Sequence, residues 1–288
     1  MQNQRTKVHP RVSEREAERT CAGTGVKEVL LLKRRLDKIY PAENNSPAGG
    51  LVDVMGDLER LVFTLHKYRY NWAPVEIPEE DVELLRNAFE YYETTLEKKK
   101  AIELLNRSEL GPRSLAEDRL IERTLSYAAA EGRMAKITGN DRILIIGSGP
   151  FPETAICYAK EFGCKVVCVD MNQEFVDVSR KLVEKLGLSD RIEVVQGFGQ
   201  EMDYSGFTKV LVTILTKSKG SILERLKESK AEIIVRTSYG ASELVYRPFE
   251  KENLLPFVEK DRLVRWGMNF TSSLILAPLP KPSGLVRL

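Results

Sequence analysis

The stretch RILIIGSGPFPETAICYAKEFGCKVVCVD, residues 142–170, is the part of the sequence that determines the fold. Residues 143–146 are apolar and largely β-branched, which is typical of a buried strand. A glycine-rich turn follows at 147–150, and a segment with apolar residues at helical spacing comes next. Residues 165–169 form a second apolar run, and Asp170 ends it. This order of strand, turn, helix and strand predicts two parallel strands joined by a right-handed crossover.

The glycine turn also indicates the kind of ligand. A dinucleotide site uses G-x-G-x-x-G, whose third glycine brings the helix close and presents its amino end to a pyrophosphate. Pro152 occupies that third position and removes an N–H from the place where a phosphate would lie. Asp170 is placed for a ribose diol. The pattern favours S-adenosylmethionine over NAD or FAD, and a structural crossover without a ligand stays open because a lone glycine motif is a weak signal.

Composition sets the broad class of the protein. The 288 residues are enough for two domains with a substantial core. Charged residues make up 30% and the net charge is only +2, so no basic excess points to nucleic acid. No apolar run approaches the ~20 residues of a membrane span, and the first residues lack an apolar signal core. We therefore expect a cytoplasmic protein without a membrane or nucleic-acid partner.

The cysteines and histidines exclude several kinds of site. Cys21, Cys157, Cys164 and Cys168 form no C-x-x-C pair, so we expect buried, reduced thiols and no metal centre. The two histidines, His9 and His66, both precede the glycine turn by a long stretch. This inventory argues against histidine-based catalysis in the C-terminal half.

The N-terminal half is predicted to be entirely helical. Residues 1–24 are polar and lack a clear period, which we interpret as a mobile tail. Apolar residues then recur at helical spacing, and the predicted helices cover residues 26–40, 51–66, 78–105 and 114–134, the last capped near Ser114. We expect these helices to form a bundle domain at 25–137.

Strands alternate with helices in the remaining part, residues 138–288. Beyond Asp170 the pattern predicts helices at 174–186 and 218–228 and strands at 192–195, 210–213, 232–236, 263–264 and 273–278. This alternation indicates a doubly wound α/β sheet. Ligands of such sheets bind at the carboxyl ends of the strands. The expected lining is therefore 147–150, Asp170, 197–199 and 213–216.

Three segments resemble the nicotianamine synthase family. Gly147–Thr154 matches the family's G-[GS]-G-x-x-P-x-T motif throughout, and the segments at 236–240 and 244–246 match a strand ending in Arg followed by Gly and an L-x-Y step. The resemblance covers roughly residues 82–273. It implies an α/β protein with an N-terminal all-helical domain followed by a Rossmann-like class I S-adenosylmethionine-dependent transferase domain.

The resemblance also implies an activity. The family transfers the 3-amino-3-carboxypropyl group of S-adenosylmethionine to an amine, releases methylthioadenosine, and so builds nicotianamine or the opine-type metallophores of bacteria. S-adenosylmethionine is then a substrate and no metal is needed. The acceptor would be an amino acid, with histidine, glutamate or a growing aminobutyrate chain left open. The broad apolar helix faces are compatible with a homodimer.

This chemistry makes demands that residues of the chain can meet. The γ-carbon must be turned toward the acceptor, and the attacking amine must lose a proton. The resemblance gives the catalytic candidates Glu97 and Glu131. Tyr127 is a further candidate, because it lies four residues before Glu131 and shares a helix face that we expect to point into the cleft. Tyr239 is the fourth, because it follows Arg236 on the turn after a strand. For Glu97 the neighbouring lysines at 98–100 leave the register open by about one turn, and a surface ion pair is the alternative.

The remaining candidates would hold the two substrates. Arg123 and Arg236 are substrate-binding candidates because their planar guanidinium groups can bind carboxylates. Tyr246 is a third substrate-binding candidate. Family members often have an acidic residue after the third strand, which recognises the adenine amino group. Here Phe198 or Gly199 stands in that turn, so we expect backbone groups and a stacked Phe198 instead. The expected cofactor-binding residues are Gly147, Ser148, Gly149, Pro150, Asp170, Met171, Gly197, Phe198, Thr213 and Leu215.

Two other functions share the same fold. A small-molecule methyltransferase would use the same S-adenosylmethionine site but release S-adenosylhomocysteine. A non-catalytic S-adenosylmethionine-binding protein would lack converging Glu and Tyr side chains in its cleft. Fold alone does not separate these alternatives.

Overall fold

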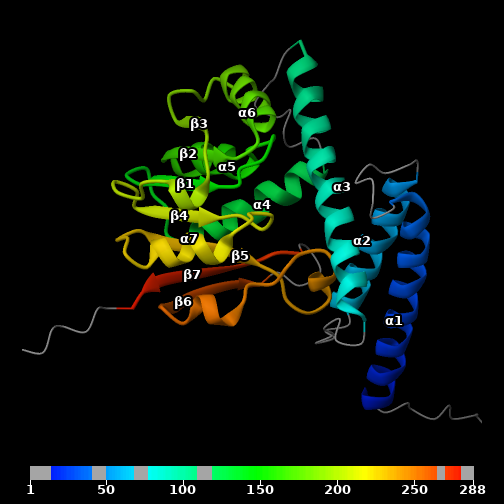
Figure 1. Cartoon of the computed structure of the whole chain (residues 1–288). Helices are drawn as coiled ribbons and strands as arrows, with labels where there is room; N and C mark the ends of the chain where they lie inside the picture. Colours follow the sequence, from blue (N-terminus) through cyan, green and yellow to red (C-terminus); the bar gives the residue numbers. More distant parts are fainter. Residues whose placement is uncertain (1–13, 41–49, 68–76, 109–118, 265–269, 280–288) are drawn as a thin grey trace, which may run out of the picture.

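The computed structural model describes residues 14–40, 50–67, 77–108, 119–264 and 270–279. Figure 1 shows a helical part beside a sheet that is covered by helices. The helical part contains α1 (Glu14–Ile39), α2 (Leu51–Lys67) and the first half of α3 (Glu79–Asn106). α4 (Arg119–Met134) leads from there into the sheet.

α3 belongs to two cores. Three acidic residues in its first turn suit the positive end of the helix dipole. Its first half buries Leu85 and Phe89 against α1 and α2. Its second half buries Ala101 and Leu104 in the core beneath the sheet. One continuous helix therefore fixes the helical part against the sheet.

The sheet has seven strands in the order β3-β2-β1-β4-β5-β7-β6. The strands are β1 (Arg142–Ile146), β2 (Lys165–Asp170), β3 (Ile192–Gln196), β4 (Lys209–Val212), β5 (Glu232–Thr237), β6 (Phe257–Val264) and β7 (Ser272–Pro278). The first five are parallel, and β7 runs antiparallel to both neighbours. Ile146 pairs with both Val169 and Val212, so the turns that follow β1, β2 and β4 emerge at one edge.

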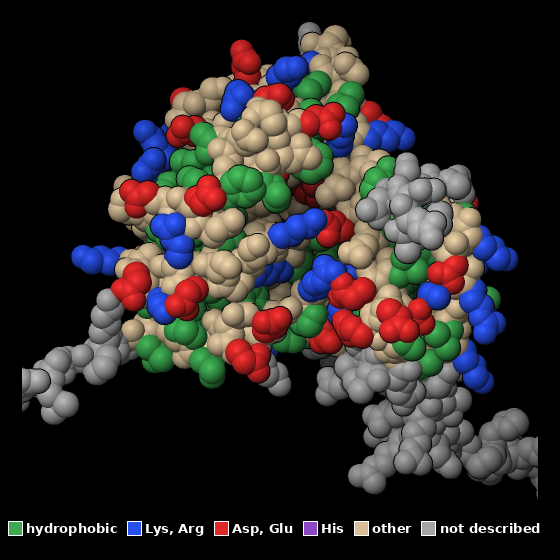
Figure 2. All heavy atoms as spheres, viewed as in Figure 1, with side chains coloured by type: hydrophobic (Ala, Val, Ile, Leu, Met, Phe, Trp, Pro, Cys, Tyr) green, Lys and Arg blue, Asp and Glu red, His purple; other side chains and the backbone are tan. Residues whose placement is uncertain are grey.

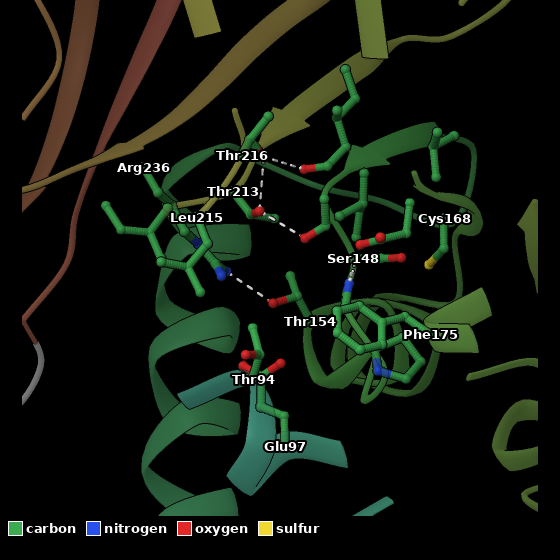
Figure 3. A pocket seen from close by; sticks show the side chains of 18 of the residues that line it. Thr94, Glu97, Ser148, Thr154, Cys168, Phe175, Thr213, Leu215, Thr216 and Arg236 are labelled. Carbon is green, nitrogen blue, oxygen red and sulfur yellow. Dashed lines mark hydrogen bonds between the residues drawn. The ribbon is translucent and has the colours of Figure 1, made fainter. Parts of the chain in front are cut away.

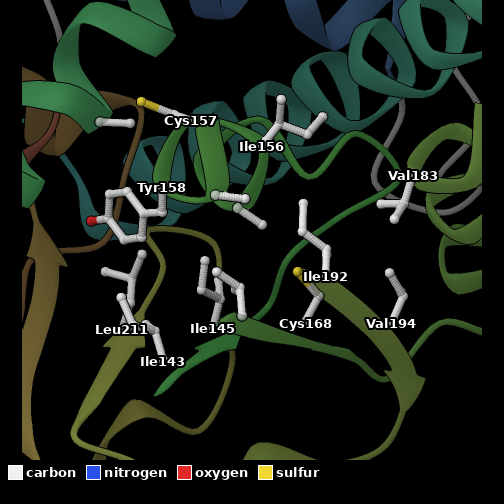
Figure 4. Packing of buried hydrophobic residues seen from close by; sticks show 14 of the residues in the cluster. Ile143, Ile145, Ile156, Cys157, Tyr158, Cys168, Val183, Ile192, Val194 and Leu211 are labelled. Carbon is white, nitrogen blue, oxygen red and sulfur yellow. The ribbon is translucent and has the colours of Figure 1, made fainter. Parts of the chain in front are cut away.

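Helices cover both faces of the sheet. On one face α4, α5 (Glu153–Phe162) and α6 (Gln173–Lys185) pack on residues such as Ile143, Ile145 and Cys168 (Figure 4). On the other face lies α7 (Lys219–Leu226), packed against the alternate residues of the same strands. Short 3-10 helices occur at η1 (Gly199–Glu201), η2 (Gly240–Leu244) and η3 (Lys251–Leu254). The strands are nearly continuously apolar because both faces are buried.

The predicted order of helices and strands is confirmed, with two differences. β6 extends over eight residues, where only a short strand was expected, because the charged residues of this strand are exposed at the sheet edge. α4 packs against α5 and the sheet instead of sharing the core of α1 and α2. α1 begins inside the segment expected to be a tail, while residues 1–13 and the expected cap Ser114 lie outside the described residues.

Other sequence expectations concern single residues and the membrane. Cys157, Cys164 and Cys168 are buried free thiols. No helix among the described ranges combines the length and the apolar character that a membrane crossing requires.

Phe89 offers a test of the joint between the two parts. Its buried ring contacts Tyr92, Tyr246 and Phe270 at centroid distances of 5.6–6.2 Å. Phe89→Ala should lower the free energy of unfolding by about 3–5 kcal/mol, measured by urea denaturation. Ile102→Ala on the same helix is the control: Ile102 is 39% exposed, and the loss should stay below about 1 kcal/mol. Equal losses in the two variants would contradict the shared-core description of α3.

Candidate active site

A cavity of about 770 Å³ lies between α3, α4 and the carboxyl edge of the sheet. Its walls come from the turns after β1, β2, β3 and β4 and from one face of α3. Figure 2 shows acidic and basic side chains gathered along the boundary between the helical part and the sheet. At this boundary Lys217 forms an ion pair with Glu90 of α3 (3.3 Å). The cavity is therefore built where both parts of the fold meet.

The glycine turn after β1 is half-buried and holds its two glycines in the left-handed conformation. Gly147 and Gly149 have φ values of +77° and +69°, which residues with side chains rarely adopt. A Cβ on Gly147 would also collide with the hydroxyl of Thr216. Thr213 donates to the carbonyl of Gly147 (2.7 Å) and Thr216 donates to that of Ile146 (2.8 Å), as the dashed lines in Figure 3 show. The turn therefore presents bare backbone to the cavity.

Asp170 fixes this turn from the end of β2. Its two carboxylate oxygens accept the backbone N–H groups of Gly149 and Asn172, each at 2.9 Å. Met171, the residue after Asp170, and Phe198 are 53% and 45% exposed although both line the cavity. Exposed apolar side chains in a concave site indicate a surface for a flat, apolar ligand group.

Besides Asp170 and Glu90, three carboxyl groups line the cavity. Glu93 and Glu97 lie one turn apart on α3, and Glu153 opens α5. Burial raises the pKa of Glu93 to about 7 and that of Glu153 to about 8. The pKa of Glu97 is raised well above its ordinary value, mainly by burial and then by the charges of Glu153, Glu93 and Asp170. A cationic ligand would favour the ionised form of all three groups.

Two contacts place these carboxyl groups. Tyr246 donates a hydrogen bond of 2.5 Å to Glu93 Oε1. Glu97 faces the glycine turn, because a Cβ built on Gly149 would lie 2.9 Å from Glu97 Oε2. In Figure 3 Glu97 extends from α3 toward the cavity, below the Arg236–Thr154 hydrogen bond. The turn and the acidic face of α3 thus lie close enough to bind one small molecule between them.

A buried ion pair forms the floor of the cavity. Arg236 of β5 donates to both oxygens of Glu131 on α4, at 3.0 and 2.6 Å, and to Thr154 at 2.9 Å. Glu131 also accepts from Tyr158 (2.8 Å) and from Ser273, and its side chain is fully buried. Arg236 reaches the cavity, whereas Glu131 lies behind it. The charge of Arg236 is therefore already neutralised before any ligand binds.

The two remaining predicted residues of α4 line the cavity wall. Tyr127 shares a hydrogen bond with Ser273 (2.7 Å), and the Arg236 guanidinium lies 5.5 Å from its ring centroid. Burial raises the pKa of Tyr127 far above its usual range. Arg123 lies 5.5 and 5.9 Å from the rings of Phe63 and Phe270. The positive charge of Arg123 acts on the carboxyl groups of Glu59, Glu93 and Glu153 and opposes the rise of their pKa values on burial.

The structure brings most of the predicted site residues together. Those that line the cavity are Glu97, Arg123, Tyr127, Gly147, Ser148, Gly149, Asp170, Met171, Gly197, Phe198, Thr213, Leu215, Arg236 and Tyr246. Three predicted residues, Pro150, Glu131 and Tyr239, do not. The backbone at Tyr239 is extended, so its side chain points away from that of Arg236 and lies under the guanidinium of Arg262 (5.2 Å). Glu131 lies one turn beyond Tyr127, and its carboxylate forms an ion pair with Arg236.

Sequence reasoning missed three acidic residues of the cavity, Glu90, Glu93 and Glu153, and the last two carried a signal. Glu93 precedes Glu97 by four residues, which places the two on one helix face. Glu153 directly follows the proline of the glycine motif, at the start of the helix that faces the ligand site. Phe270 carried no local signal, because only the tertiary fold brings it against α3.

The sequence is similar to curated proteins over part of its length. L-histidine 2-aminobutanoyltransferase of Pseudomonas aeruginosa is 27% identical over 124 residues, which are 42% of this chain and 47% of the relative. The Yersinia pestis protein of the same name is 23% identical over 122 residues, 41% of this chain and 46% of that relative. The chain thus spans about half the length of the curated relatives it matches. No family model matches the sequence.

Solved structures extend the comparison to most of the chain. The nicotianamine synthase MtNAS in complex with MTA and tNA has a TM-score of 0.76 at 21% identity, covering 88% of this chain and 98% of its own. The resemblance to the nicotianamine synthase family is confirmed. A mutant of MtNAS in complex with S-adenosylmethionine has a TM-score of 0.73 at 20% identity and the same coverage. These structures confirm the predicted fold, an N-terminal helical part followed by a Rossmann-like α/β sheet.

Removing Glu131 should destabilise the whole fold. Glu131→Ala leaves the guanidinium of Arg236 buried and unpaired, and we expect a loss of about 3–5 kcal/mol in urea denaturation. Glu161→Ala is the matched control. Its ion pair with Arg133 is more than half exposed on both sides, so the loss should stay below about 1 kcal/mol. A loss for Glu131→Ala as small as that of the control would show that the pair is not a structural support.

Proposed function

We propose that this protein transfers the 3-amino-3-carboxypropyl group of S-adenosylmethionine to a nitrogen of an amino-acid acceptor, releasing methylthioadenosine, in the synthesis of a nicotianamine-like or opine-type metallophore. One observation carries the proposal: the acidic face of α3 closes a glycine turn of the S-adenosylmethionine-binding type, with Glu97 directly opposite Gly149. The named relatives and the nicotianamine synthase structures support it.

The cavity fits S-adenosylmethionine group by group. Asp170 would accept the ribose hydroxyls, and Met171 and Phe198 would contact the adenine faces. The bare turn at 147–149 allows close approach of the ligand. The carboxyl groups of α3 would face the sulfonium and the ammonium, and Arg123 offers a cation for a carboxylate. A volume of about 770 Å³ lies in the upper part of the range of small-molecule sites and leaves room for an acceptor.

The proposed reaction is a displacement at the γ-carbon. The acceptor nitrogen forms a bond to this carbon while the bond from carbon to sulfur breaks, and the bonding electrons stay on sulfur as the thioether of methylthioadenosine. The attacking nitrogen gives up one proton, and the proposed acceptor of this proton is Glu97, whose carboxyl group faces the glycine turn. The positive sulfonium favours the ionised form of Glu97 that this role needs.

The direct test of the proposal is product identification. Purified protein is incubated with S-adenosylmethionine and a panel of amino acids, and the nucleoside product is identified by mass spectrometry. Methylthioadenosine is the expected product. S-adenosylhomocysteine would instead establish the methyltransferase alternative, and cofactor binding without any product would support a non-catalytic binding protein.

Glu97→Gln tests the role of the carboxylate. The amide keeps the shape of the side chain but cannot accept the proton, so kcat should fall about 10²- to 10⁴-fold while KM for S-adenosylmethionine changes much less. Glu103→Gln is the matched control, because Glu103 lies on the same helix and pairs with Lys100 at the surface (3.5 Å). Its kcat should equal that of the unchanged protein. An equally small effect in both variants would remove Glu97 from the mechanism.

A further inference from the structure

Glu153 is a carboxyl group of the cavity to which the proposed reaction gives no role. It stands between Pro152 and Thr154, at a position that the family motif leaves open. Its side chain is half-buried, lines the cavity and forms a hydrogen bond with Thr124 of α4. A carboxyl group costs free energy in such a place, because its charged form loses water. Its presence in the wall therefore points to a ligand group that compensates this cost.

The charged groups around Glu153 come from three other elements of the wall. Arg123 lies on α4 and Arg236 on β5, and their charges favour the ionised form of Glu153. Glu93 lies on α3, and its charge opposes that form. Glu97, one turn further along α3, is affected more by the charge of Glu153 than by that of any other residue. The charges of Glu97 and Glu153 therefore oppose each other.

Neither arginine neutralises Glu153. Arg236 donates to both carboxylate oxygens of Glu131. Arg123 shares its charge among three carboxyl groups, which are those of Glu59 on α2, Glu93 and Glu153. Burial therefore prevails, and it raises the pKa of Glu153 to about 8. As a result, Glu153 is mainly protonated and neutral in the empty site at pH 7.

The sulfur of S-adenosylmethionine would lie near the carboxyl groups of Glu97 and Glu153. Asp170 is the proposed partner of the ribose, and a single CH2 group joins the ribose ring to the sulfur. Asp170 accepts the N–H of Gly149 at 2.9 Å, and a Cβ built on Gly149 would lie 2.9 Å from Glu97 Oε2. Glu153 begins the helix that follows this turn. The ligand atoms next to the ribose therefore reach the end of the cavity that these carboxyl groups line.

We infer that Glu153 recognises the positive charge of the sulfonium: it is neutral in the empty site, gives its proton to the solvent when S-adenosylmethionine binds, and takes a proton back once the sulfur has become a thioether. This inference rests on the proposed function and deepens it. The proton of Glu153 is separate from the one that the acceptor nitrogen gives to Glu97 during the transfer, so each step balances. The ionised carboxylate attracts the sulfonium of the substrate, whereas the neutral carboxyl group offers no such attraction to methylthioadenosine. The product is therefore released more readily than the substrate.

The inference is tested by titration calorimetry without an acceptor. The two probes are S-adenosylmethionine and S-adenosylhomocysteine, which differ only in the methyl group and the positive charge on sulfur. In buffers of different ionisation enthalpy at pH 7, S-adenosylmethionine should release about one proton more than S-adenosylhomocysteine. The ratio of the two Kd values should shift in favour of S-adenosylmethionine by about 10- to 30-fold from pH 6 to pH 7.5. Below the pKa of Glu153, each pH unit makes the removal of its proton about tenfold more favourable.

Glu153→Gln keeps the shape of the side chain and removes its charge. Kd for S-adenosylmethionine at pH 7.5 should rise about 10- to 100-fold, the range of a lost charge-assisted interaction, and the excess proton release should fall below about 0.3. Kd for S-adenosylhomocysteine and methylthioadenosine should change less than about 3-fold, whereas damage to the fold would weaken all three ligands. Glu161→Gln, an exposed position on the same helix α5, is the control and should change none of these values. Glu93→Gln should keep the excess proton release.

Binding and product formation separate the two possible failures. Equal proton release with both probes, or an excess that persists in Glu153→Gln or disappears in Glu93→Gln, would overturn the inference, while formation of methylthioadenosine would still support the proposed function. If the binding results are as expected but no methylthioadenosine forms with any acceptor, the proposed transfer fails and the recognition of the sulfonium stands. If S-adenosylmethionine does not bind at all, both fail.

Discussion

The buried ion pair between Glu131 and Arg236 is the interaction on which the cavity depends. It joins α4 to β5, and Tyr158, Thr154 and Ser273 satisfy its remaining hydrogen-bonding capacity. Two charges removed from water persist only when each finds such partners. Because Tyr127 shares its hydroxyl with Ser273 and lies beside Arg236, the same network holds a wall of the cavity in place. Because Glu131 neutralises Arg236, the charge of the cavity is determined mainly by its other carboxyl groups.

Those carboxyl groups make the empty site a weak point of the fold. The pKa values of Glu93 and Glu153, about 7 and about 8, exceed the ordinary value of 4.5. Between pH 4.5 and these raised pKa values, the two carboxyl groups stay protonated in the folded chain but ionise in the unfolded chain. The free energy of unfolding of the empty protein therefore falls as the pH rises through this range. A bound cation stabilises the ionised carboxyl groups and so offsets this loss of stability. Binding of a positively charged substrate is therefore favoured by the same charges that oppose folding, as is common where function and stability compete.

The sequence was sufficient for local features and insufficient for those that depend on tertiary contacts. The glycine turn, Asp170 and the strands carry their conformation in adjacent residues, so their place at one sheet edge was predictable. Glu131 was expected in the cleft because it shares a face with Tyr127, but only the fold shows that Arg236 already occupies it. Tyr239 follows β5 in the chain, yet the extended backbone turns it toward Arg262. The sequence pattern of α4 likewise could not reveal which of two cores it joins.

The shared role of α3 restricts how the length of this helix can change. One inserted or deleted residue would rotate everything beyond it by about 100°. If Phe89 kept its place in the first core, Ala101 and Leu104 would turn out of the second core, and a change just before Glu97 would turn its carboxyl group off the glycine turn. Changes in substrate choice along this wall are therefore confined to substitutions of side chains.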